Sequence, residues 1–214
     1  MKKKITILDY NMGNLFSVKN AFLSFGVETK ISSNSTEFGE SDALIIPGVG
    51  AFGEAVDNLK KRNLINPIID FYNTGKPIMG ICLGLQLFFE NSEEFGYNKG
   101  LGIIKGDVLK FKTNIDSKQK IPHMGWNKVL NEKNETFWEK SPLNDIPNDA
   151  FMYFVHSYYV KPVDEDVVLS TTEYLGNKFC SSIKFKNIFA CQFHPEKSGK
   201  DGINIFKKWH DLIP

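Results

Sequence analysis

Residues 76–86 read KPIMGICLGLQ, an apolar run followed by a cysteine between two glycines. The run is typical of a buried strand, and the residues after Cys82 have the spacing of an apolar helix. A strand, the pattern Gly-x-Cys-x-Gly and a helix together form the thiol counterpart of the nucleophile elbow, a sharp turn that exposes a nucleophile. Glycines suit this turn because the strand and the helix approach each other closely there. The stretch therefore predicts an α/β fold with Cys82 at a strand-to-helix turn.

The chain before Gly100 alternates between strand-like and helix-like patterns. The predicted strands cover residues 4–10, 27–32, 42–48 and 76–81. The predicted helices cover residues 14–26, 53–75 with a break near Pro67, and 84–96. Short connections between such elements indicate right-handed crossovers. We therefore expect an α/β fold with a mostly parallel, doubly wound sheet flanked by helices.

The chain after Gly100 is richer in strand-like patterns, which predicts an antiparallel extension of the sheet in the second half. The strand-like pieces cover residues 102–112, 127–131, 150–162, 167–176, 178–185 and 187–193, and a helix is predicted over 201–213. No repeat or low-complexity linker interrupts the chain. We therefore expect a single domain over residues 1–214.

Composition excludes several classes of function. The net charge of +1 gives no electrostatic reason to expect binding to nucleic acid or to a membrane surface. No apolar run reaches the length of a membrane span or of a signal-peptide core. Three cysteines without a CxxC pair do not make a disulfide framework or a zinc site. We expect a cytoplasmic protein whose thiols stay free.

Cys82 has the sequence context of a reactive thiol. It precedes a predicted helix, and the positive end of a helix dipole favours the thiolate. The backbone N–H of Leu83 points at the same place and can hold a developing oxyanion. The alternative is a buried structural cysteine, which is the usual fate of this residue type. The glycines favour the nucleophile, whereas Cys180 and Cys191 have no base partner visible in the sequence and are interpreted as structural.

A nucleophilic cysteine requires an imidazole base, which in turn requires an orienting group. The chain has four histidines. His210 lies in the last predicted helix among charged residues, and His123 and His156 can each be satisfied structurally. His194 differs because an apolar strand runs directly into His194-Pro-Glu196, where the proline ends the strand. Glu196 can then accept from one ring nitrogen while the other faces the thiol.

A glycine-rich loop follows the third predicted strand. Residues 48–53 read GVGAFG and match G-x-G-x-x-G between a strand and a helix, which is the context of a dinucleotide-binding fingerprint. Against that interpretation, the loop follows the third strand, Pro47 precedes it, and the acid some twenty residues on, Asp70, falls within a predicted helix. An ordinary turn and a set of backbone N–H donors for an oxyanion are the other interpretations. All three remain open at this point.

The motifs PGVGAFG, GICLGLQ and QFHPEKS resemble those of the class I, triad-type glutamine amidotransferases. Three further stretches, DYNMGNLFSVKNAF, IPHMGWN and YFVHSYYV, are similar to the glutaminase subunits of imidazole glycerol phosphate synthases. The motifs appear in the family's order from Asp9 to Ser198. The resemblance therefore covers essentially the whole chain.

The resemblance implies a glutaminase that needs neither a cofactor nor a metal. Cys82 would attack the side-chain amide of L-glutamine, and His194, held by Glu196, would transfer the protons. The backbone N–H groups of Leu83 and, after a peptide rearrangement, of Val49 would hold the oxyanion. Water would then release glutamate from the thioester.

The resemblance also implies a substrate pocket and a partner. The positions that would line the glutamine pocket are Gly48, Gly50, Gln86, His156, Ser157 and Tyr158. Ammonia would pass to a (β/α)8-barrel cyclase subunit, which makes imidazole glycerol phosphate and aminoimidazole carboxamide ribotide in histidine biosynthesis. The positions that would dock on the barrel in a heterodimer are Asn11, Asn14, Pro122, Met124, Trp126, Tyr153 and Lys197.

Two residues depart from the family pattern. Asn11 stands where a glycine is usual, and Lys105 stands where a proline is common. They leave room for a paralogue that supplies ammonia to another barrel partner, for example in the amidation of a surface sugar. A dinucleotide-binding module that uses Gly48–Gly53 and a free-standing cysteine hydrolase or peptidase are the alternatives from other classes.

Overall fold

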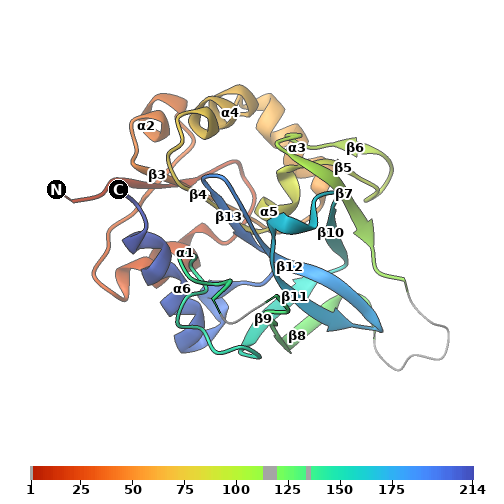
Figure 1. The fold of residues 1–214 in the computed structure, drawn as a ribbon. Helices are drawn as coiled ribbons and strands as arrows, with labels where there is room; N and C mark the ends of the chain where they lie inside the picture. Colours follow the sequence, from red (N-terminus) through yellow and green to blue (C-terminus); the bar gives the residue numbers. More distant parts are fainter. Residues whose placement is uncertain (1, 113–119, 134–135) are drawn as a thin grey trace.

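A computed structural model describes residues 2–112, 120–133 and 136–214. Among these residues, eleven strands form one large sheet with the order β2-β1-β3-β4-β13-β12-β10-β7-β5-β6, and β11 pairs with β12. Helices cover both faces of this sheet, as Figure 1 shows. The predicted α/β architecture, with a doubly wound sheet and an antiparallel extension, is confirmed.

The first half of the sheet is parallel. Strands β2, β1, β3, β4 and β13 lie side by side in that order, and each pair among them is parallel. All residues of the four longer strands are buried, because helices cover both faces and leave no side exposed to water. The bounds of these strands are β1 (Ile5–Leu8), β2 (Lys30–Ser32), β3 (Ala43–Gly48), β4 (Ile78–Cys82) and β13 (Ile188–Cys191).

Two hydrophobic cores, one on each face, hold the helices to this sheet. Leu44 and Ile46 of β3 belong to the core beneath α2, α3 and α4, whereas Ile45 between them belongs to the core beneath α1 and α6. This alternation follows from the two-residue period of a strand. The helices are α1 (Leu15–Leu23), α2 (Ser35–Gly39), α3 (Phe52–Lys61), α4 (Ile65–Asn73) and α6 (Gly199–Asp211). None of the helices in the described part of the chain is long and apolar enough to cross a membrane.

The second half of the sheet is mainly antiparallel. Strands β13, β12, β10 and β7 lie side by side in that order, and each pair of neighbours among them is antiparallel. Strand β7 also pairs parallel with β5. The strands are β5 (Phe89–Ser92), β6 (Asn98–Lys99), β7 (Ile104–Lys110), β10 (Tyr158–Pro162), β11 (Val168–Tyr174) and β12 (Asn177–Phe185). A separate two-stranded sheet contains β8 (His123–Lys128) and β9 (Phe151–His156).

Several predicted elements differ from the structure. The helix predicted over 84–96 is wrong beyond its first turns: α5 (Leu83–Leu87) is short, and the chain continues as β5. Phe88 and Phe89 are fully buried, and β5 pairs with β7, so tertiary pairing overrides the local helical spacing. The strand predicted over 127–131 instead begins at His123.

The predicted break in the helix over 53–75 lies between α3 and α4, and Pro67 stands in the first turn of α4. A proline fits there because the first turn has no intrahelical partner for its N–H. Helix α2, which follows the cap residue Asn34, was absent from the sequence prediction.

Candidate active site

Cys82 ends β4 in a strained turn. Its backbone has φ 55° and ψ −106°, and α5 begins at the next residue. A positive φ at a residue other than glycine costs about 1–3 kcal/mol and is kept where the surrounding structure enforces it. The turn directs the thiol toward the carboxyl ends of the parallel strands.

The two glycines beside Cys82 allow α5 to pack closely on the sheet. A Cβ at Gly84 would lie 1.8 Å from the carbonyl oxygen of Ile46, a separation that no side chain can adopt. A Cβ at Gly80 would lie 2.6 Å from the ring of Phe88. The turn therefore has the geometry that the Gly-x-Cys-x-Gly pattern predicts.

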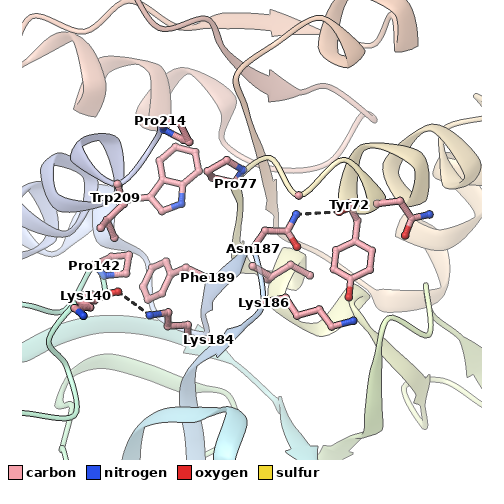
Figure 2. A pocket seen from close by; sticks show the side chains of 14 residues that line it. Tyr72, Pro77, Lys140, Pro142, Lys184, Lys186, Asn187, Phe189, Trp209 and Pro214 are labelled. Carbon is pink, nitrogen blue, oxygen red and sulfur yellow. Dashed lines mark hydrogen bonds between the residues drawn. The ribbon is translucent and has the colours of Figure 1, made fainter.

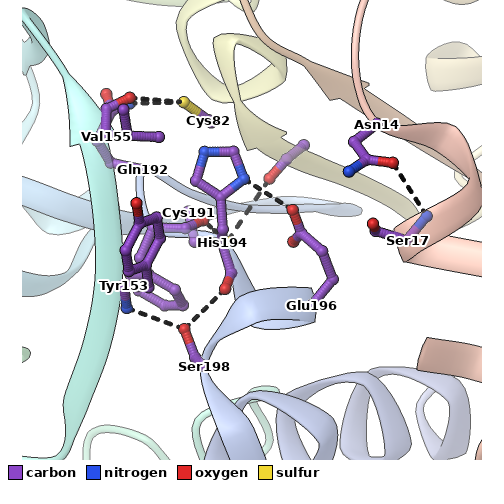
Figure 3. A network of polar contacts seen from close by, with 12 residues as sticks. Asn14, Ser17, Cys82, Tyr153, Val155, Cys191, Gln192, His194, Glu196 and Ser198 are labelled. Carbon is purple, nitrogen blue, oxygen red and sulfur yellow. Dashed lines mark hydrogen bonds and ion pairs between the residues drawn. The ribbon is translucent and has the colours of Figure 1, made fainter. Parts of the chain in front are cut away.

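The sulfur of Cys82 lies among buried polar groups. The residue is 5% exposed, and its Sγ lies 3.5 Å from Nε2 of Gln192 and 3.9 Å from the carbonyl oxygen of Val155. Figure 3 shows the imidazole of His194 between this thiol and Glu196. Three elements, β4, β9 and the chain after β13, thus meet at the sulfur.

His194 and Glu196 form a buried pair directly after β13. Nδ1 of His194 lies 2.8 Å from Oε1 of Glu196, and both side chains are 2% exposed. Nε2 of His194 has no hydrogen-bond partner in the described part of the chain. Ser198 fixes the turn, because its hydroxyl donates to the carbonyl oxygen of His194 at 2.7 Å and accepts from the backbone N–H of Tyr153 at 3.0 Å.

The charges around His194 favour its imidazolium form. Burial acts against that form, but the interactions with Cys82 and with the Glu196 carboxylate outweigh it and raise the pKa of His194. An imidazole that holds a proton beside a thiol is the arrangement of a nucleophile with its acid–base partner. The site can therefore support nucleophilic attack followed by proton donation to a leaving group.

A small pocket opens onto the sulfur. Its volume is about 160 Å³. Its lining residues come from the loops after β3 and β5, from the end of β4, from α5, and from the end of β9 through the start of β10: Val49, Gly50, Cys82, Leu83, Gln86, Glu94, Val155, His156, Ser157 and Tyr158. Gly48, the remaining residue predicted for the glutamine pocket, is buried beneath it and pairs in register with Cys82.

Glu94 was missed by the sequence analysis. It lines the pocket, its carboxylate accepts from the backbone N–H of Phe52 at 2.7 Å, and burial raises its pKa. The acidic pair Glu93-Glu94 soon after the elbow was the available signal. The predicted helix over 84–96 did not indicate that Glu94 would reach the pocket, because in the structure the chain forms β5 and turns after it.

A larger pocket lies at the opposite ends of the same strands. Its volume is about 620 Å³, and it is lined by residues at the amino ends of β4 and β13, including Pro77 and Ile188, with Lys184 and Trp209. Figure 2 shows its side chains, and none of the residues that surround the thiol is among them. Volume alone therefore does not locate the reactive site in this molecule.

A directed chain of hydrogen bonds passes behind the pocket. Nδ1 of His156 donates to the carbonyl oxygen of Tyr158 at 2.8 Å, so its Nε2 accepts from Nδ1 of His123 at 3.1 Å. Nε2 of His123 then accepts from the amide of Asn127 at 3.2 Å. Burial lowers the pKa of His123 to about 4 and that of His156 to about 3, so both rings are neutral at pH 7.

The seven residues predicted to dock on a partner lie in two groups. Pro122, Met124 and Trp126 are exposed on or beside β8, and Trp126 pairs in register with Tyr153 of β9. The Lys197 ammonium lies 5.6 Å from the centre of the Tyr153 ring.

The other group follows β1. Asn11 has φ 66° and accepts from Arg62, and the side chain of Asn14 caps α1 by accepting from the backbone N–H of Ser17 at 3.2 Å. Both residues are exposed. They stand at the carboxyl end of a parallel strand, the same end that carries Cys82.

The fold, the elbow and the thiol–imidazole–carboxylate arrangement define a class of glutamine-hydrolysing proteins. The model of the family "Glutamine amidotransferase class-I" matches residues 6–210. The chain belongs to this family. Solved structures with the same fold include that of PurLQS from Thermotoga maritima, with a TM-score of 0.75 at 18% identity and full coverage of both chains.

Curated relatives narrow the class. The chain is 45% identical over 212 residues to the imidazole glycerol phosphate synthase subunit HisH of Sulfurimonas denitrificans. The aligned region covers 97% of this chain and 99% of the relative. It is 46% identical to the HisH subunit of Lactococcus lactis, with 99% and 100% covered. The HisH subunit of Aquifex aeolicus is 45% identical over 96% of this chain. Within its class, the chain belongs to the HisH subunits.

Proposed function

We propose that this chain is the glutaminase subunit of imidazole glycerol phosphate synthase and that residues 1–214 act as one glutaminase domain. It hydrolyses L-glutamine to glutamate and ammonia. The observation that carries the proposal is the buried His194–Glu196 pair at 2.8 Å beside the thiol at the elbow of β4. Three free cysteines agree with action in a reducing cytoplasm.

The reaction passes through a thioester on Cys82. The thiolate attacks the side-chain amide carbon of glutamine, and His194 gives its proton to the departing nitrogen, which leaves as ammonia. A water molecule then attacks the thioester carbon while His194 accepts its proton, and glutamate leaves as the Cys82 thiolate is restored. Glu196 keeps the imidazole oriented and stabilises its charged form in both steps.

The pocket supplies groups of the correct kind for glutamine. The backbone N–H of Leu83 follows the nucleophile, as in other elbow enzymes, and we assign it to the oxyanion. Val49 lies on the rim of the pocket, 41% exposed, and supplies the second donor after its peptide rearranges. Glu94 is the carboxylate that faces the α-ammonium group. The other substrate contacts are assigned to Gly48, Gly50, Gln86, His156, Ser157 and Tyr158.

The exposed side chains of β8 support a docking face for a (β/α)8-barrel cyclase. Met124 is 63% exposed and Trp126 is 55% exposed, and methionine and aromatic side chains are enriched at protein–protein interfaces. The complex is a heterodimer in which ammonia passes to the barrel without entering solvent. We assign the face to Asn11, Asn14, Pro122, Met124, Trp126, Tyr153 and Lys197.

The two departures from the family pattern are compatible with this assignment. Asn11 has a left-handed φ of 66°, and asparagine adopts that region more readily than other residues with a side chain. It therefore replaces glycine with little strain. Lys105 is exposed on β7 and does not line the pocket.

Glutamate release measured for the chain alone and with its barrel subunit tests the proposal. We expect low release alone, because an oxyanion site that needs a peptide rearrangement is not preformed, and strong stimulation when the barrel and its ligand are present. Cys82→Ser should release no glutamate in either state. High release without a partner would contradict the gating, and activity of Cys82→Ser would contradict the thioester.

A further inference from the structure

Two buried side-chain amides lie beside the triad, and neither transfers a proton or forms a covalent bond in the steps above, although Gln86 is among the assigned substrate contacts. Gln192 is 0% exposed, and Gln86 is 4% exposed. A buried amide is costly unless its donors and acceptor are paired, so their hydrogen bonds are informative. Both amides are connected to the sulfur of Cys82.

The orientation of both amides is fixed by one backbone carbonyl. The carbonyl oxygen of Tyr158 can only accept, so the group that Gln86 directs at it, 3.0 Å away, is the Nε2 donor. The same Nε2 lies 3.0 Å from Oε1 of Gln192 and donates its second hydrogen there. Gln192 must then direct its own Nε2 at Sγ of Cys82, at 3.5 Å. The amide that faces the sulfur is therefore a donor.

We propose that Gln192 stabilises the Cys82 thiolate by direct hydrogen bonding and that Gln86 is a positioning residue acting through Gln192. The inference deepens the proposed function, since it rests on Cys82 as the nucleophile. An N–H donor aimed at an ionisable group favours its charged form. Gln192 thus supplies a charge-stabilising contact in addition to that of His194.

The two hydrogen-bond contacts of the sulfur favour opposite protonation states. The carbonyl oxygen of Val155, 3.9 Å away, can only accept from a neutral S–H. The Nε2 group of Gln192 can only donate, and a hydrogen bond to a charged thiolate is roughly twice as strong as one to a neutral thiol. Ionisation therefore shifts the sulfur from the Val155 contact to the Gln192 contact.

Alkylation of Cys82 without glutamine tests the inference. The full chain is treated with iodoacetamide from pH 5 to 10. The modified cysteine is identified by peptide mass spectrometry, because all three cysteines are free and buried and only Cys82 lines the pocket. Loss of one hydrogen bond to a charged group should slow alkylation of Gln192→Leu at pH 7 by about tenfold. The rate at the alkaline plateau should stay that of the wild type. Gln86→Leu should show a smaller change in the same direction.

Gln192→Glu separates charge stabilisation from packing. The substitution keeps the shape of the side chain and an acceptor for Gln86, but it places a carboxylate oxygen beside the sulfur. If Gln192 only fills space, Gln192→Glu should react as the wild type does. If it stabilises the thiolate, Gln192→Glu should react more slowly at pH 7 than Gln192→Leu.

Ser170→Ala is the matched control. Ser170 is 2% exposed and bonds to the hydroxyl of Ser181 at 2.9 Å, on strands β11 and β12 and outside the pocket. It should lose a buried hydrogen bond without a change in the alkylation profile. Wild-type profiles in both Gln192 variants would overturn the inference. Because the readout contains no glutamine, glutaminase failure and failure of this inference are measured separately.

Discussion

The carboxyl and amino ends of the parallel strands carry pockets of different character. At the carboxyl ends, a pocket of about 160 Å³ brings together the thiol of Cys82, the carboxylate of Glu94 and the buried imidazole of His156. At the amino ends, a pocket of about 620 Å³ contains lysines and apolar side chains, among them Lys184, Lys186 and Phe189. Strand direction explains the difference, because the loops of a doubly wound sheet converge at the carboxyl ends of its strands. The direction of the strands is thus a better guide to the site than the size of a cavity.

Removal of His194 should have the largest effect at the carboxyl ends. His194→Gln loses the proton donor for ammonia, and loss of a triad base typically costs a factor on the order of 10³ or more in turnover. Glutamate release in the complex with the barrel subunit measures it. His210→Gln, in α6 and outside the pocket, should retain the wild-type rate. Equal losses in the two variants would mean that the imidazole at the elbow has no special role.

A methyl group at Gly84 should have the next largest effect. Gly84→Ala places a Cβ against the carbonyl oxygen of Ile46, at 1.8 Å in the unrelaxed structure, so we expect a loss of about 3 kcal/mol or more in the free energy of unfolding. Urea denaturation measures this loss. At Gly39, in α2, a Cβ meets nothing within 4 Å, so Gly39→Ala should unfold with nearly wild-type free energy. A tolerated Gly84→Ala would remove the packing explanation of the elbow.

Acid should weaken the carboxyl-end site through its neutral histidines. Burial lowers the pKa of His123 to about 4 and of His156 to about 3, whereas the unfolded chain binds protons at the ordinary histidine pKa of about 6.5. The unfolded state therefore binds more protons below that pH, and the free energy of unfolding should fall by up to about 1.4 kcal/mol per pH unit for each ring.

The acid effect should be absent above about pH 7.5, where both rings are neutral in either state. His194 acts in the opposite direction at higher pH, because its raised pKa lets the folded chain bind more protons, and its contribution vanishes below about pH 5.5, where it is protonated in both states. Urea titrations at pH 5.5, 5 and 4.5 measure the slope, and His123→Gln should reduce it. A slope unchanged in that variant would show that other groups control the acid response.

The smallest effect is expected at the amino ends. Lys184 is exposed and donates to the carbonyl oxygen of Lys140 at 2.7 Å, and it lies outside the pocket that contains the thiol. Lys184→Met should change the free energy of unfolding by no more than about 0.5 kcal/mol and leave glutamate release in the complex unchanged. A large loss of activity would show that the two ends of the sheet are coupled.

The parts of the fold that sequence predicts are those set by local pattern. The apolar runs of β1, β3, β4 and β13 are buried on both faces, so each is recognisable without knowledge of its neighbours. Strand β5 is different, because its residues are in a strand only through pairing with β7. The apolar spacing over 84–96 does favour a helix locally, but pairing with the distant strand β7 overrides that preference.

The same distinction applies to the site. The glycines beside Cys82 and the proline after His194 mark turns that are local, so both positions could be predicted. Gln192 and Glu94 could not, since an amide or a carboxylate carries no local sign of what it will face. The contact of Gln192 with the sulfur exists only because β13 lies next to β4 in a particular register.

The place of β13 in the sheet also determines when the chain can complete its fold during synthesis. This late strand lies between β4 and β12, and α6 after it packs on α1, with the rings of Phe22 and Phe206 4.9 Å apart. Gln192 follows Cys82 by 110 positions, which a ribosome translates in roughly 5–20 s. Until then the growing chain has an elbow cysteine but neither its imidazole nor the strand that covers one edge of β4. A nascent chain is therefore catalytically silent, and its unpaired β4 edge is the surface that a chaperone would have reason to protect.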